Sequence, residues 1–491
     1  MKKKLLTLAS ALILPLLAMA QGWPANYGGV MLQGFFWDSW TQTPINGPQG
    51  GNLYDLQNPD MAPADGYTWA TIYGAGWSLE SEEWQVPLTT WNSLLNHIND
   101  IAPYIDLLWL PQSGSTICPP TSIFDKAQDT SGRQAWRAWR NGSYYEYTTG
   151  MQINQPDCMG FVPVFYFHHG VDDVNNPWTY TYHWGSYTDE NPTNEVRTFT
   201  PKSYFGTENE LRTLISAYRA AGTGAVEDVV ANHRGCFGTW TFTSDDGNIT
   251  FYSSKANLDF PTELYTGQFA GLTWDQIRGG QTVDPNTSEY ISWDTNDVCS
   301  DDESAYNGGH PTGGPDCGGQ GEWARDIQHH NPVTQAKVVK YLDFLRNNLG
   351  YLGFRYDYAM GFEGIHYGEY NTTLRPPFSV GEYWGDIANI TSWIGSTSME
   401  GNYQSAAFDF PLMNAINQAF NYGDYRCLEN AGMIGDKDMR RYAVTFVDNH
   451  DTFKDLPTDG SNANYQHRTN RSIEEANAFI YLHDATIRLY C

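Results

Sequence analysis

The chain has 491 residues, which is long enough for a large barrel with an additional inserted domain. Its formal net charge is −28, and only 17% of its residues are charged. Such an acidic chain is not expected to bind nucleic acid or an anionic membrane surface, because both repel negative charge.

The first twenty residues have the pattern of a secretory signal peptide. Three lysines at positions 2–4 precede an apolar stretch at 5–17, and the small-residue segment 18–20 (AMA) offers a cleavage site before Gln21. The apolar stretch is too short to span a bilayer comfortably, and no other segment is suitable. We therefore expect a secreted or periplasmic protein with no membrane span in its mature form.

Export also permits disulfides among the seven cysteines. Cys118–Cys158 and Cys299–Cys317 are plausible pairs, but connectivity does not follow from the sequence.

Apolar runs of strand length alternate with segments of helical periodicity along most of the chain. Strands are predicted at 29–36, 105–110, 225–231, 353–358, 377–383 and 442–451, and the intervening helices include one that starts at a capping box at 207–210 and one that starts at Asn331-Pro332. Between 234 and 325 the helical periodicity disappears, and Gly, Asp, Thr, Ser and aromatic residues dominate. This order predicts an α/β fold, a (β/α)8 TIM barrel with an irregular domain inserted after strand 3. The predicted boundaries are a signal peptide at 1–20, the first part of the barrel at 21–233, the inserted domain at 234–325 and the second part of the barrel at 326–491.

Three of the predicted strands each deliver a carboxylate where the strand ends. Asp357 follows the apolar residues of its strand, as do Glu382 and Asp451 on two others. In parallel α/β folds the reactive groups lie at the carboxyl ends of strands, so these acids are candidate catalytic residues. Arg355 lies two residues before Asp357 and therefore on the same face of the strand.

Four segments in order resemble the signature regions of the α-amylase family, which are retaining glycoside hydrolases acting on α-glucans. They are 227–233 (EDVVANH), 353–357 (GFRYD), 381–384 (GEYW) and 446–451 (FVDNHD). The opening segment 32–38 (LQGFFWD) and the GEYW phrase resemble the plant and archaeal branch. The abundant aromatic residues also suit sugar recognition, although most of them are expected to lie in the core.

The resemblance implies a role for each residue of the constellation. Asp357 would be the nucleophile, Glu382 the general acid and then the base, and Asp451 the carboxylate that stabilises the transition state. Arg355 would keep Asp357 ionised and oriented. The remaining implied sugar-binding residues are His233, His450 and Phe161, the last in place of the family's usual tyrosine.

Calcium is the cofactor that the resemblance implies. The matching ligands are the side chains of Asn232 and Asp326 and the backbone carbonyl of Gly361, which fits the preference of calcium for oxygen. The implied substrate is starch or a maltooligosaccharide, and we further expect a monomer.

The end of the chain departs from the family pattern. After the helix-like segment 473–482, the tail 483–491 (HDATIRLYC) does not resemble the expected strand. We therefore expect that the eighth strand and the C-terminal β-sandwich domain are missing, as after a frameshift or premature stop. Three functions stay open at this point: a secreted α-amylase, a related transglycosylase or maltooligosaccharide-forming enzyme, and a glucan-binding protein whose catalysis is impaired.

Overall fold

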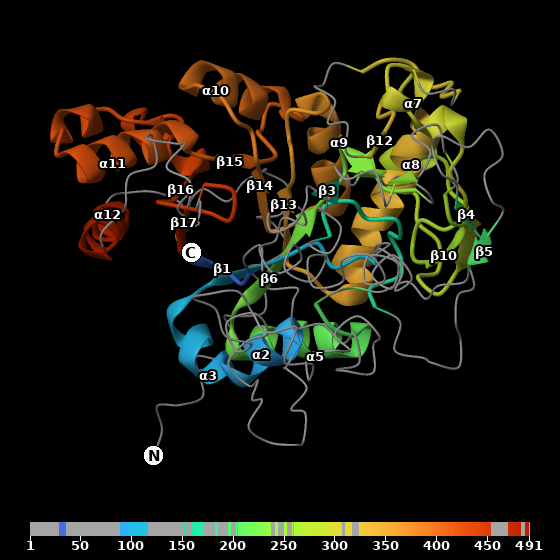
Figure 1. Ribbon diagram of the computed structural model, residues 1–491, viewed down its shortest axis with the longest axis horizontal. Coiled ribbons are helices and arrows are strands. Elements are labelled where there is room, and N and C mark those ends of the chain that lie inside the picture. The colour runs from blue at the N-terminus through green and yellow to red at the C-terminus, as the bar shows by residue number, and fades with distance from the viewer. Residues whose placement is uncertain are drawn as a thin grey trace, which may run out of the picture. The chain divides into compact units, whose positions relative to one another are not determined.

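The computed structural model (Figure 1) describes the following residues: 29–35, 89–115, 152–153, 160–170, 182–184, 195–197, 203, 205–236, 241–243, 250–252, 258, 260–306, 310–316, 324–452, 470–482 and 487–490. The predicted signal peptide lies outside these residues. Among the described helices, none is long and apolar enough to cross a membrane.

The chain divides into two compact units, one made of Met1–Leu32 and Leu352–Cys491 and the other of Gln33–Tyr351. We call them the first and the second unit. The predicted boundaries of the signal peptide, barrel parts and inserted domain stay predictions.

Parallel strands and helices alternate along the first unit. In chain order its elements are β1 (Gly29–Gln33), β13 (Gly353–Tyr356), α9 (Gly364–Leu374), β14 (Phe378–Gly381), α10 (Ile387–Ser396), β15 (Ala406–Phe408), α11 (Phe410–Tyr422), the short turns η9 (Tyr425–Leu428), η10 (Met433–Gly435) and η11 (Arg440–Tyr442), β16 (Ala443–Thr445), α12 (Asn470–Leu482) and β17 (Ile487–Tyr490). Strands β13, β14, β15, β16, β17 and β1 pair in that order, all in parallel. From β13 to β17 each strand is therefore next to the strand that follows it in the chain, and β17 pairs in addition with β1, which is the arrangement of a (β/α) barrel wall.

The second unit carries a further parallel strand pair and the irregular insertion. Its elements are α2 (Thr90–Asn96), α3 (Ile98–Ile101), η5 (Ala102–Tyr104), β2 (Leu107–Leu110), β3 (Gln152–Ile153), β4 (Tyr182–Trp184), β5 (Glu195–Arg197), α5 (Glu208–Ala221), β6 (Gly224–Val229), β7 (His233–Arg234), β8 (Thr241–Thr243), β9 (Thr250–Tyr252), β10 (Glu263–Thr266), α6 (Trp274–Arg278), β11 (Ser288–Ile291), η7 (Thr295–Asp297), α7 (Glu303–Tyr306), β12 (Arg325–Asp326), α8 (Pro332–Asp343) and η8 (Phe344–Leu349). Strand β2 pairs in parallel with β6, whereas β10–β11, β7–β12, β4–β5 and β3–β8–β9 are antiparallel. The fold class is the predicted (β/α)8 barrel with a β-rich insertion after β6, the third of the barrel strands.

Helix starts follow the local signals in the sequence. The Thr207 side chain accepts a hydrogen bond from the Glu210 backbone, and the Glu210 side chain accepts one from the Thr207 backbone, so the predicted capping box is confirmed. Asn331 caps α8, and Pro332 occupies its first turn, also as predicted.

The prediction that the eighth strand is missing is wrong. Residues Ile487–Tyr490 form β17, which pairs in parallel with both β16 and β1. Leu489 is buried at 1% exposure. The tail does not resemble the family's phrase for this strand, but isoleucine and tyrosine are common strand residues, so a short segment without that phrase can take the position. The predicted absence of a C-terminal β-sandwich stays a prediction.

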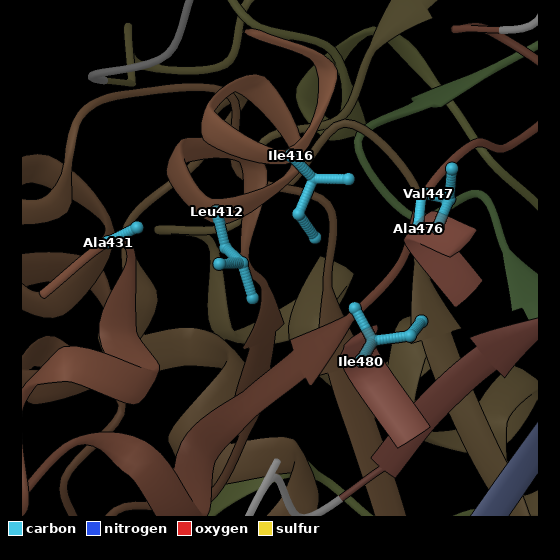
Figure 2. Packing of buried hydrophobic residues seen from close by; sticks show 6 residues of the cluster. All are labelled: Leu412, Ile416, Ala431, Val447, Ala476 and Ile480. Atoms are coloured by element: carbon cyan, nitrogen blue, oxygen red, sulfur yellow. The ribbon is translucent and has the colours of Figure 1, made fainter. Parts of the chain in front are cut away.

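An apolar cluster of the first unit packs behind the loop that follows β16. Figure 2 shows its members, and they come from α11, α12 and the neighbouring loops. They are Leu412, Ile416, Ala431, Val447, Ala476 and Ile480. Val447 lies four residues before Asp451, so burial of this cluster helps to anchor the segment that carries the third candidate carboxylate.

If β17 contributes to the core, replacing its buried leucine destabilises the protein. We expect Leu489→Ala to lower the free energy of unfolding by about 2–5 kcal/mol, because it removes buried methyl groups and leaves a cavity. The matched control is Leu482→Ala, since Leu482 is 85% exposed. Urea unfolding followed by tryptophan fluorescence measures both, and equal effects would contradict the role assigned to β17.

Candidate active site

Two candidate catalytic carboxylates follow neighbouring strands of the first unit. Strands β13 and β14 pair with Tyr356 opposite Gly381, so the next residues, Asp357 and Glu382, leave the sheet side by side. The backbone N–H of Glu382 donates to the carbonyl of Tyr356 over 2.9 Å, which extends the ladder to this point. Both acids thus lie at the carboxyl ends of neighbouring strands.

Glycine is required directly before Glu382. A Cβ atom at Gly381 would collide with the indole ring of Trp393 from α10. The ring thus packs directly against the backbone of β14 and fixes the position of the strand end from which Glu382 projects.

One guanidinium group contacts both carboxylates. Arg355 Nη1 lies 2.6 Å from Asp357 Oδ1, and Arg355 Nη2 lies 2.7 Å from Glu382 Oε1. Arg355 is fully buried, so these ion pairs are only weakly screened by water. The arginine predicted to orient Asp357 therefore orients both acids.

Burial raises the pKa of Glu382 well above its ordinary value of 4.5. The Arg355 guanidinium opposes this shift, while the negative charges of Asp357 and Asp451 add to it. Glu382 is 3% exposed, whereas the side chain of Asp357 is 13% exposed. A carboxyl group that stays protonated beside one held by a cation is the pairing that acid–nucleophile catalysis needs.

The residue after the candidate nucleophile has an uncommon backbone conformation. Tyr358 has φ of +44°, which non-glycine residues rarely adopt, and its backbone N–H donates to Glu382 Oε2 over 3.1 Å. The turn therefore supplies a second fixed contact to the candidate acid. Sequence reasoning missed Tyr358, because no residue type at this position signals a left-handed turn.

The remaining first-unit candidates lie in the loop after β16 and in the turn after β13. His450 Nε2 lies 3.4 Å from Asp451 Oδ2, with His450 buried and the Asp451 side chain 30% exposed. Burial, with the nearby positive charge of Arg355, holds the pKa of His450 well below 6.5, so the ring is neutral. Gly361 is buried in the turn after β13, where its N–H donates to the Tyr358 carbonyl.

The other candidates belong to the second unit. His233 Nε2 lies 2.7 Å from the carbonyl oxygen of Phe161, whose ring is 7% exposed. Asn232 Nδ2 lies 3.2 Å from His233 Nδ1. The predicted sugar-binding residues His233 and Phe161 are thus neighbours.

Two oxygen atoms near β7 and β12 suit a cation. Asp326 pairs with His233 across these strands, and the Ile327 N–H donates to the carbonyl of Asn232. Asn232 Oδ1 and Asp326 Oδ1 are both buried and accept no hydrogen bond, which is costly for polar atoms unless a ligand satisfies them. Burial and the neighbouring carboxylates raise the pKa of Asp326 to about 9, which a bound cation would reverse.

A buried polar network beneath the second-unit strands was not foreseen from the sequence. Glu227 Oε1 accepts hydrogen bonds from the backbone N–H and the hydroxyl of Ser113, at 2.9 and 2.7 Å. The same hydroxyl lies 2.8 Å from His169 Nδ1 and accepts from the Tyr351 hydroxyl over 3.1 Å. All four side chains are buried, so this network is a structural feature and no substrate reaches it.

Comparison with known proteins gives the following relatives. No family model matches the chain. "Alpha-amylase 3, chloroplastic" of Arabidopsis thaliana is 24% identical over 270 residues, which cover 51% of this chain and 25% of that protein. "Probable alpha-amylase 2" of the same plant is 27% identical over 271 residues, covering 51% and 53%. An alpha-amylase of Bacillus licheniformis is 24% identical over 289 residues, covering 52% and 50%. The matched segment thus spans between a quarter and about half of these relatives.

Among solved structures, alpha-amylase I of Eisenia fetida matches with a TM-score of 0.44 and 12% identity, covering 81% of this chain and 64% of that one.

The buried network predicts a pH dependence of stability. Burial raises the pKa of Glu227 from 4.5 to about 8, although the neighbouring Tyr351 hydroxyl and the hydrogen bonds from Ser113 oppose the rise, and Asp228 adds to it. His169 stays neutral because burial lowers its pKa to about 3. Between about pH 4.5 and 8 the folded chain holds a proton that the unfolded chain releases, so stability falls as pH rises through this window.

In Glu227→Gln this contribution disappears, because glutamine does not ionise. As pH rises from about 5 to 8.5, we expect the free energy of unfolding to fall by a few kcal/mol less in Glu227→Gln than in the unmodified chain. One pKa unit corresponds to about 1.4 kcal/mol. Urea unfolding at several pH values measures this, with Glu429→Gln, at an exposed position, as the control. An unchanged slope in Glu227→Gln would show that Glu227 is already ionised in the folded protein.

Proposed function

We propose that this chain, which belongs to the α-amylase family, is a glycoside hydrolase that cleaves internal α-1,4 bonds of starch-like glucans with retention of configuration. The observation that carries the proposal is the buried Arg355 guanidinium in contact with both Asp357 and Glu382. Retaining hydrolysis needs two carboxyl groups close together, one ionised and one protonated, and a cation in contact with both brings them together.

In the first step, Asp357 Oδ attacks the anomeric carbon while Glu382 gives its proton to the departing glycosidic oxygen. The ion pair with Arg355 holds the Asp357 carboxylate in place for the attack. The raised pKa of Glu382 keeps the proton available at neutral pH. The products of this step are a shortened glucan and a covalent glycosyl-enzyme.

In the second step, the deprotonated Glu382 takes a proton from water, and the resulting hydroxide displaces Asp357 from the sugar. Asp451 is 30% exposed and its negative charge favours the positively charged, oxocarbenium-like transition state. His450 is neutral and lies beside Asp451, so it can donate a hydrogen bond to a sugar hydroxyl in the cleaved position. His233 and the ring of Phe161 are the second-unit residues proposed to contact the sugar.

Calcium is the proposed cofactor. Asn232 and Asp326 would hold it through their buried side-chain oxygens, which accept no hydrogen bond from the protein. Bound calcium would stabilise the fold around β7 and β12 without entering the reaction. We further propose that the protein is secreted or periplasmic and acts as a monomer.

A related transglycosylase or maltooligosaccharide-forming enzyme would use the same carboxylates, and the product profile separates these activities. A glucan-binding protein without catalysis is the alternative from another class. The retained geometry of Asp357, Glu382 and Arg355 favours an active enzyme over this alternative.

Removing the nucleophile tests the proposal directly. We expect Asp357→Asn to reduce the release of reducing ends from soluble starch by roughly four orders of magnitude or more, because the amide cannot form the glycosyl-enzyme. Asp438→Asn is the matched control at an exposed position of the same unit and should keep full activity. Equal activity of both variants would refute the assigned nucleophile, and starch binding without hydrolysis by the unmodified chain would favour the binding protein.

Removing a calcium ligand tests the cofactor. After treatment with a chelator, we expect added calcium to raise the thermal unfolding midpoint of the unmodified chain, because a ligand that binds only the folded state stabilises it. This increase should be largely lost in Asn232→Ala and retained in Asn389→Ala, whose side chain is exposed. An identical increase in both variants would exclude Asn232 as a ligand.

A further inference from the structure

A cysteine thiol and two carboxyl groups lie together in the inserted part of the second unit. Cys299 Sγ and one carboxylate oxygen each of Asp316 and Asp326 lie within 4.8 Å of one another. Cys299 is fully buried, Asp326 is 4% exposed, and Asp316 is partly buried. Cys299 is not in a disulfide, and its predicted partner Cys317 lies outside the described residues.

The backbone fixes two members of this cluster rigidly against each other. Val298 and Ile327 form an antiparallel bridge, and the N–H of Cys299 donates to the carbonyl of Asp326 over 3.0 Å. The thiol and the Asp326 carboxylate therefore come from directly paired backbone positions. Such preorganisation lowers the cost of assembling a ligand site.

The charges around the cluster leave one carboxylate without compensation. Asp302 is already engaged, since its Oδ1 lies 2.8 Å from Arg325 Nη1 and its Oδ2 accepts from the backbone N–H of Asp326. Asp326 Oδ1, by contrast, is buried and accepts no hydrogen bond. A buried carboxyl oxygen in that state is costly, and its position next to a thiol and a second carboxyl group points to a cation as the missing partner.

We propose that Cys299, Asp316 and Asp326 form a binding site for a borderline-soft divalent cation of the Zn²⁺ type. Calcium prefers oxygen ligands only, whereas zinc combines a thiolate with carboxylates in a compact tetrahedral shell, with water in the fourth position. On binding, the thiol loses its proton to solvent and the sulfur bonds the metal. This site differs from the proposed calcium set in its sulfur ligand and in Asp316, and it shares Asp326, so the two cations compete. The inference does not depend on the proposed hydrolysis of glucans.

Cobalt(II) is the probe for the sulfur ligand, because a thiolate bonded to cobalt gives a charge-transfer band in the near ultraviolet. The full chain is kept reduced, stripped of metal with a chelator and titrated with Co²⁺. We expect a band that saturates at one equivalent, that is removed by added Zn²⁺, and that disappears in Cys299→Ser. It should persist in Cys427→Ser, since Cys427 is a free cysteine of the first unit.

Asp316→Asn keeps the test decisive if Cys299→Ser disturbs folding. We expect it to weaken Co²⁺ binding by roughly tenfold or more while circular dichroism stays unchanged. Absence of the band from the unmodified chain, or its persistence in Cys299→Ser, would overturn the proposal. Cobalt binding is measured without starch hydrolysis. Neither outcome of this experiment therefore affects the test of the proposed activity.

Discussion

The buried guanidinium of Arg355 is the constraint on which the first-unit site depends. Two carboxylates with opposite tasks follow β13 and β14, and their charges would repel if both were ionised. One arginine in contact with both offsets this repulsion, while burial raises the pKa of Glu382 well above its ordinary value. The arginine itself is held within strand β13, where it has little freedom to swing away.

The backbone around the same strands is also tightly packed and helps to position Glu382. Trp393 lies against Gly381, and the left-handed turn at Tyr358 directs a backbone N–H to Glu382. Such a conformation costs free energy, and the surrounding packing has to compensate for it. The candidate acid is therefore positioned by a charged side chain and by main-chain groups together, which limits how far its carboxyl group can move before it meets substrate.

The inserted part of the second unit combines a rigid antiparallel framework with a buried carboxyl oxygen that accepts no hydrogen bond. Strands β7 and β12 bring Asn232 and Asp326 together, and the adjoining bridge adds Cys299. Arg325 neutralises Asp302 but leaves Asp326 with an oxygen that accepts no hydrogen bond. A cation would stabilise this arrangement, and its chemical type depends on whether sulfur takes part in binding it.

The sequence by itself determined the fold class, the resemblance to the α-amylase family and the strand ends at which the candidate carboxylates lie, because these depend on apolar periodicity and on short motifs that are contiguous in the chain. Tertiary structure decided the contacts between distant segments. It placed Arg355 against Glu382 as well as Asp357, brought Asp316 and Cys299 to Asp326, and buried Glu227 in a network with Ser113 and Tyr351. It also recruited the tail as β17, since an open strand position next to β16 and β1 requires only a short apolar segment and no particular motif.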